Sequence, residues 1–218
     1  MRTKTLLLTA VLGIAAAATS MADVFSVNVV GYVNVNLTNG FNLLGNPLVS
    51  SNNNAIGQVL PTVPEGSVVY TLKTNGQFNT DLYASGAWYD SVTEVPSTTT
   101  LPPGKGFFVF SPSATTVTFV GEVKQGTNTV SLNSGFSLVS SVAPQSYELI
   151  GTNFPTSAAF THYKLVGSTY QVSNFDPTIG WYDSTTEAPR QVLTAPANGF
   201  FIFNNGGTQP WTRSFTVN

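Results

Sequence analysis

The sequence predicts an all-β fold made of two tandem homologous units, each a β-sandwich or barrel-like domain. Three observations support this. A nine-residue segment occurs twice, short runs of alternating apolar and polar residues recur along the chain, and no segment after residue 22 has helical periodicity. A unit of about 95 residues with about seven short strands has the size of a small sandwich or barrel.

The duplication is read directly from matching segments. Trp88–Pro96 reads WYDSVTEVP and Trp181–Pro189 reads WYDSTTEAP, so seven of nine positions agree at an offset of 93. The triplet Gly106–Phe108 recurs at the same offset as Gly199–Phe201. We therefore expect β repeat unit 1 over residues 23–119, with a border strand at 25–29, and β repeat unit 2 over residues 120–218.

Alternation of residue types predicts the individual strands. In Phe25–Leu37 the apolar side chains share one face and the asparagines the other, which indicates a half-buried strand. Two hairpins are predicted around Asn75-Gly76 and Gly167-Ser168. Their strands are Val68–Leu72 with Phe78–Leu82, and Thr161–Leu165 with Tyr170–Phe175.

Two segments are apolar on both faces and so predict central strands. They are Phe107–Phe110 and Phe200–Phe203, each preceded by a proline and a glycine. We expect Gly106 and Gly199 to let the backbone turn into these strands, with the prolines stiffening the approach.

The first 22 residues have the pattern of a secretory signal peptide. Arg2 and Lys4 precede an uncharged apolar run, and Ser20-Met21-Ala22 places small residues at the cleavage site. The run is shorter than the ~20 residues that a membrane-spanning helix needs, and no later segment is longer and as apolar. We expect export to the periplasm, the outer surface or the medium, with no integral membrane segment in the mature chain.

Charge and composition exclude several function classes. Eight basic and ten acidic residues become six and ten once the signal peptide is removed, and no basic patch forms, which argues against nucleic acid as a partner. The chain has no cysteine, which removes thiol catalysis and thiolate metal sites. A single histidine, His162, rules out a histidine-based zinc site. We expect it on the surface, because its neighbour Tyr163 matches Tyr70 and both tyrosines are taken to face the core. We predict no cofactor and no enzymatic activity.

The repeated aromatic–acidic segment supplies the candidate ligand-binding residues. Exposed Trp and Tyr rings can stack on sugar rings while a neighbouring carboxylate accepts hydrogen bonds from hydroxyls. Burial of the same rings in the two cores is the alternative. The candidate residues are Trp88, Tyr89, Asp90, Trp181, Tyr182 and Asp183.

The carboxylates of this segment have alternatives of their own. Asp90 and Glu94 recur as Asp183 and Glu187, and such pairs occur in calcium sites and in glycoside hydrolysis. Ordinary turn chemistry, with each aspartate bonding nearby backbone N–H groups, accounts for the same pattern.

A short segment that borders the repeat units occurs three times, although there are only two units. Phe25–Asn28 resembles both Phe119–Glu122 and Phe215–Asn218. Either Phe119–Val123 serves both bodies, or Phe25–Val29 adds as a strand to a neighbouring chain and makes the protein self-associate.

The segments VNVVGYVNVNL, GFNLLGNPL and LPPGKGFFVF together resemble a family of secreted repeat proteins of verrucomicrobial and planctomycete bacteria. More loosely, they are similar to β-modules of bacterial surface and adhesion proteins. The resemblance implies an exported β-module and carries over no catalytic residue. Unit 2 departs from the pattern, because Ser140-Ser141-Val142 stands where unit 1 has Gly45-Asn46-Pro47.

These observations favour a non-catalytic structural or adhesive protein at the cell surface or in the extracellular matrix. The alternative is a carbohydrate-binding module that uses Trp88 and Trp181 as aromatic platforms.

Overall fold

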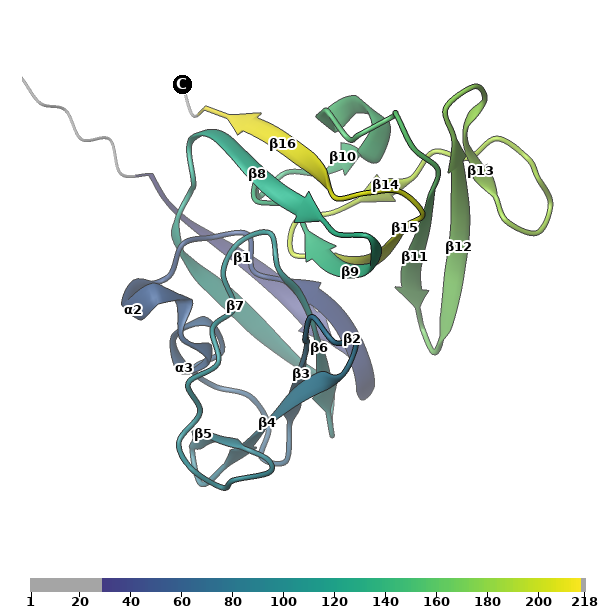
Figure 1. Ribbon diagram of the computed structural model, residues 1–218. Coiled ribbons are helices and arrows are strands. Elements are labelled where there is room, and N and C mark those ends of the chain that lie inside the picture. Colours follow the sequence, from purple (N-terminus) through teal and green to yellow (C-terminus); the bar gives the residue numbers. More distant parts are fainter. Residues whose placement is uncertain (1–28, 217–218) are drawn as a thin grey trace, which may run out of the picture.

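The computed structural model describes residues 29–216, and within them the fold is all-β, as predicted. Each unit combines one five-stranded antiparallel sheet with one two-stranded ribbon, and no sheet closes into a barrel. In Figure 1 unit 1 (purple to teal) lies below unit 2 (green to yellow). The predicted signal peptide, residues 1–22, and the border segment Phe25–Asn28 lie outside the described residues.

Unit 1 contains seven strands, as expected. Its ribbon pairs β1 with β7, and its sheet has the order β2-β6-β3-β4-β5. The bounds are β1 Val30–Leu37, β2 Gly40–Gly45, β3 Val68–Leu72, β4 Phe78–Ala84, β5 Ala87–Asp90, β6 Gly106–Ser111 and β7 Thr115–Glu122.

Unit 2 repeats this arrangement. Its ribbon pairs β8 with β16, its sheet has the order β9-β15-β11-β12-β13, and the two short strands β10 and β14 pair beside it. The bounds are β8 Gly126–Leu132, β9 Gly135–Ser140, β10 Tyr147–Glu148, β11 Phe160–Val166, β12 Thr169–Asp176, β13 Gly180–Asp183, β14 Leu193–Thr194, β15 Gly199–Asn204 and β16 Gln209–Phe215.

Both predicted hairpins are confirmed, and so is the alternation of β1. Leu37 is buried on the inner face of β1, whereas Asn34 and Asn36 are exposed. The Thr118 hydroxyl donates to Asn34 Oδ1 at 2.7 Å and the Thr116 hydroxyl to Asn36 Oδ1 at 2.8 Å. Such cross-strand polar pairs stabilise the exposed face of a ribbon.

Each unit has its own hydrophobic core between its ribbon and its sheet. In unit 1 the strand β6, which lies between β2 and β3, contributes the fully buried Phe107. In unit 2 the matching Phe200 packs 5.9 Å from Trp211 of the ribbon. Burial of each of these rings is worth roughly 2–3 kcal/mol.

Three single turns of helix depart from the expected all-strand pattern. They are α2 Ser51–Asn54, α3 Ile56–Val59 and the 3₁₀ turn η1 Leu149–Thr152. They are too short to show periodicity in the sequence. In α2 the three asparagines have φ of 48°, 54° and 59°, a left-handed geometry that asparagine tolerates better than most residues.

The strand register corrects the expectation of three equivalent border segments. Phe119 lies opposite Val33 on β1, whereas Phe215 lies opposite Gly126 on β8. The equivalent glycines Gly40 and Gly135 follow β1 and β8 and align the two ribbons. In this alignment the unit 2 residue at the position of Phe119 is Arg213. Phe119 and Phe215 are therefore not structural equivalents. The strand β7 also continues to Glu122, beyond the expected division between residues 119 and 120.

The two units join through a two-fold-like pattern of backbone contacts. The N–H of Gly45 donates to the Ala197 carbonyl at 2.9 Å, and the N–H of Ser140 donates to the Gly104 carbonyl at 3.0 Å. The bridge between Leu44 and Asn198 matches that between Lys105 and Val139. Each contact is repeated with the units exchanged.

This join explains the repeated glycines of the two central strands. A Cβ on Gly106 would lie 2.8 Å from the Val139 carbonyl oxygen, and one on Gly199 would lie 2.2 Å from that of Leu44. Neither glycine has a positive φ, so the expectation that they turn the chain into the strand is wrong. They allow close approach of two backbones instead.

The departure of unit 2 from the repeat also lies at this join. Gly45 and Ser140 occupy equivalent positions and face each other. A Cβ on Gly45 would lie 2.0 Å from the Ser140 Cβ. At most one of the two positions can therefore carry a side chain, so Ser140 is tolerated in unit 2 only because unit 1 has glycine at position 45.

Candidate binding clefts at the join of the two units

The tryptophans predicted to form sugar-binding platforms are buried. Trp88 is 5% exposed and Trp181 is 4% exposed. Trp88 donates from Nε1 to the Leu60 carbonyl at 2.9 Å, and its ring packs 5.2 Å from that of Tyr83. Trp181 packs 5.2 Å from Phe175 in the core of unit 2. Neither ring has a face open to a ligand. The prediction that these tryptophans stack on sugars required exposed rings, and the structure instead has both packed in the cores, which was the alternative.

The aspartates of the repeated segment bond the backbone of their own turns. Asp90 Oδ1 accepts from the N–H groups of Thr93 at 2.8 Å and Val92 at 2.9 Å, and these bonds lower the pKa of Asp90. Asp183 makes the same bonds to Thr186 and Thr185, with the same effect on its pKa. In addition Asp183 pairs with Arg190. The turn alternative therefore accounts for both aspartates.

The remaining members of the segment serve the same turns. Glu94 and Glu187 each have φ of 58°, and their N–H groups close the turn onto the carbonyls of Asp90 and Asp183. Tyr89 and Tyr182 are half-buried, and each forms an isolated β-bridge with the proline that ends its own segment. Among residues 29–216 no three acidic or histidine side chains gather as metal ligands would.

The expected surface position of His162 is wrong, because the faces of its strand are reversed. His162 is 3% exposed and packs 5.0 Å from the ring of Phe200, while Tyr163 lies on the outer face. Burial lowers the pKa of His162 to about 3, with smaller contributions from Lys164 and Arg190. The imidazole is therefore neutral near pH 7 and enclosed in the core.

The outer faces of the two five-stranded sheets carry an aromatic layer that the sequence reasoning missed. In unit 1 Phe41 lies 5.6 Å from Tyr70, and in unit 2 the matching Phe136 lies 5.7 Å from Tyr163. Phe108 and Phe201 meet at 5.7 Å across the join. The layer therefore extends over both units. It consists of Phe41, Tyr70, Phe78, Phe108 and Phe110 of unit 1, and Phe136, Tyr163, Tyr170, Phe201 and Phe203 of unit 2.

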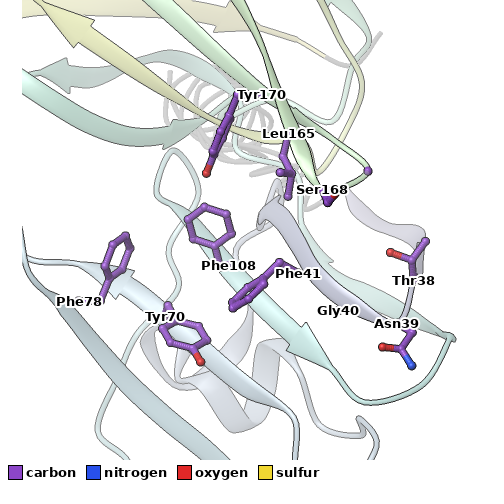
Figure 2. Close-up of a pocket in the computed structure, with 11 residues that line it drawn as sticks. Thr38, Asn39, Gly40, Phe41, Tyr70, Phe78, Phe108, Leu165, Ser168 and Tyr170 are labelled. Carbon is purple, nitrogen blue, oxygen red and sulfur yellow. The ribbon is translucent and has the colours of Figure 1, made fainter.

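An aromatic cleft of about 800 Å³ opens where this layer crosses the join. Its floor is the outer face of the unit 1 sheet, and the β11–β12 hairpin of unit 2 overhangs it (Figure 2). Phe41 is 52% exposed and Tyr170 is 44% exposed, so rings from both units remain accessible. Burial raises the pKa of Tyr170. The lining residues are Thr38, Asn39, Gly40, Phe41, Tyr70, Phe78, Phe108, Leu165, Gly167, Ser168 and Tyr170.

A second cleft, of about 810 Å³, lies at the equivalent turn and hairpin with the units exchanged, although the rest of its lining differs from that of the first. The β8–β9 turn of unit 2 and the β3–β4 hairpin of unit 1 form it. We call it the lysine cleft, because Lys73 and Lys105 line it together with Phe136.

Comparison with known proteins gives no relative from which a role could be transferred. No protein-family model, no curated protein and no solved structure matches the chain. Over residues 29–216, no helix has the length and apolar character needed to cross a membrane.

Proposed function

We propose that this chain is an exported, non-catalytic adhesive protein that binds an uncharged polysaccharide in the aromatic cleft. The observation that carries the proposal is the lining of that cleft, which contains five aromatic rings and no charged side chain. This retains the adhesive function favoured by the sequence. It moves the carbohydrate-binding alternative from the buried tryptophans to the outer face.

The chemistry of the lining matches a neutral sugar chain. Aromatic faces stack on the C–H surfaces of sugar rings, and Phe41, Phe78 and Tyr170 are all exposed. Thr38, Asn39 and the tyrosine hydroxyls supply a few hydrogen-bonding groups at the margin of the cleft. A charged ligand would lose its hydration there without gaining a charged partner, which is unfavourable.

Binding of the mature chain to insoluble cellulose, chitin and starch tests this proposal. Phe78→Ser and Tyr170→Ser remove one accessible ring from each unit and should each weaken binding about three- to tenfold, the effect of one lost aromatic contact. Val92→Ser and Ile179→Ser are matched controls, because both side chains are exposed and neither lines the cleft. The proposal fails if the wild-type chain binds none of these polymers, or if ring variants and controls bind equally.

A structural role through self-association is a second candidate, favoured by the outer face of the unit 1 ribbon. Val30, Tyr32 and Val120 are more than half exposed there and form a small apolar surface. Val29 also continues the pairing of β1, since its carbonyl accepts from the Val123 N–H at 2.7 Å. The proposed contact through Phe25–Val29 otherwise falls on residues outside the described part of the chain.

Size-exclusion chromatography of the mature chain distinguishes this second candidate. Wild-type protein should elute as an oligomer, and both Tyr32→Ser and a chain lacking residues 23–28 should elute as monomers. A wild-type monomer at all concentrations would dismiss self-association.

A further inference from the structure

The two clefts share one backbone plan but differ in charge. Lys105 of the lysine cleft corresponds to the uncharged Asn198, at the offset of 93 that also relates Gly106 to Gly199, and Asn198 does not line the aromatic cleft. Lys73 lies on the β3–β4 hairpin, whose counterpart in the aromatic cleft contributes only Leu165, Gly167, Ser168 and Tyr170. The duplication has therefore produced one neutral cleft and one cationic cleft.

Within residues 29–216 neither lysine of the cleft forms an ion pair, although Lys73 lies near enough to Asp90, and Lys105 to Asp81, for a weaker attraction. No acidic residue is part of its lining, and the single ion pair among the described residues joins Arg190 to Asp183. Burial lowers the pKa of Lys105, an effect that attraction to Asp81 partly offsets. A partly buried ammonium of this kind is stabilised by an anion that replaces its lost hydration.

The rest of the lining suits a sugar chain more than a small anion. Phe136 is 54% exposed and offers an accessible ring. Four residues with hydroxyl groups, Thr74, Thr129, Ser131 and Ser134, also line the cleft. These groups come from both units and spread along an open cleft of about 810 Å³, whereas an inorganic anion needs donors that converge on one point.

We propose that the lysine cleft binds an acidic polysaccharide whose charges are carboxylates, a polyuronate. Two lysines match a chain with about one carboxylate on each sugar ring, and the aromatic and hydroxyl groups contact the rings between them. Nucleic acid does not fit, because the mature chain has more acidic than basic residues and no wider basic surface. The proposal does not depend on the aromatic cleft being occupied.

Binding to immobilised polygalacturonate tests it, with dextran as the neutral polymer and poly-glutamate as a carboxylate chain without sugar rings. The mature chain should bind polygalacturonate more tightly than either control polymer. Lys73→Gln should weaken this binding roughly tenfold, the loss expected for one charge-assisted contact. Lys105→Asn installs the uncharged residue that unit 2 has at the equivalent position, Asn198, and should have a similar effect.

Control variants separate this site from general charge and from the aromatic cleft. Lys124→Gln removes an equal charge from an exposed lysine that lines neither cleft, and it should leave binding unchanged. Tyr170→Ser should also leave polygalacturonate binding intact. The thermal midpoint of each variant shows whether it is folded, and Lys73 is exposed, so its substitution is not expected to disturb the fold.

Four results would each overturn the proposal. They are absence of polygalacturonate binding, equal binding of poly-glutamate, equal weakening by Lys124→Gln, and unchanged binding by both Lys73→Gln and Lys105→Asn.

Discussion

Substitution of Gly199 by alanine tests the proposed reason for the repeated glycines. The added Cβ would lie 2.2 Å from the Leu44 carbonyl oxygen, 2.8 Å from its carbon and 3.1 Å from its nitrogen. These are backbone atoms of β2 in the other unit, so no side-chain rotation relieves the overlap. The φ of Gly199 is not positive, and alanine therefore brings no conformational strain of its own.

The cost follows from how far the join must open. Overpacking of a tight contact costs about 1–3 kcal/mol. If the units separate enough to lose the bonds Gly45 N–H to Ala197 and Ser140 N–H to Gly104, each contributes about 0.5–1.5 kcal/mol more, which gives a total of about 2–6 kcal/mol. For a chain of this size each kcal/mol lowers the thermal midpoint by about 2–4 °C.

Urea unfolding monitored by tryptophan fluorescence measures this change in the free energy of unfolding. Gly151→Ala is the matched control in the same unit, because nothing lies within 4 Å of its added Cβ and its φ is not positive. If Gly199→Ala unfolds within about 0.5 kcal/mol of this control, the close-approach explanation is wrong, since exposed substitutions without special features stay within that range.

Three further predictions concern the join and the cores. Gly45→Ser should destabilise the protein by about 1–3 kcal/mol, and adding Ser140→Gly should restore most of this loss in a double-mutant cycle, because the pair can hold only one side chain. His162 has a folded pKa of about 3 against 6.5 when unfolded, so below pH 6.5 the unfolded chain binds the extra proton and stability falls by about 1.4 kcal/mol per pH unit. Replacing His162 by valine should remove this slope between pH 6.5 and 4.5 in urea titrations, and an unchanged slope would contradict its burial. Acrylamide should quench Trp88 and Trp181 only weakly, and bound polysaccharide should not alter that quenching; strong quenching would mean that the rings are accessible.

The join gives a physical reason for the sequence difference between the repeats. Equivalent positions of two identical units meet each other at a two-fold-like axis, as Gly45 and Ser140 do here. Once both copies belong to one chain, the sequence of each can change independently of the other. The two clefts beside the axis also differ in the residues that line them. Lys105 lines the lysine cleft, whereas Asn198 at the equivalent position lines neither cleft.

The position of Tyr70 and Tyr163 on the outer faces of the sheets shows how far sequence reasoning reached into the candidate site. Alternation predicted correctly that Tyr163 and His162 occupy opposite faces of one strand, but it could not determine which face is covered by the ribbon. Because both faces of this sheet carry large apolar or aromatic residues, hydrophobicity alone did not separate them. The sequence reasoning therefore assigned Tyr70 and Tyr163 to the core, and the aromatic layer was missed.

The sequence by itself determined the all-β class, the duplication and the position of both hairpins, because these depend on period-two patterns and turn residues that act locally along the chain. Only the tertiary structure decided that the repeated tryptophans are core, that the glycines serve the contact between units, and that two clefts form at that contact. The clefts bring together residues about 60 to 130 positions apart, such as Phe41 with Tyr170 and Leu72 with Phe136. The contact between units likewise joins distant backbone, as at Gly199 and Leu44. No local pattern reports which distant backbone will pack against a given face.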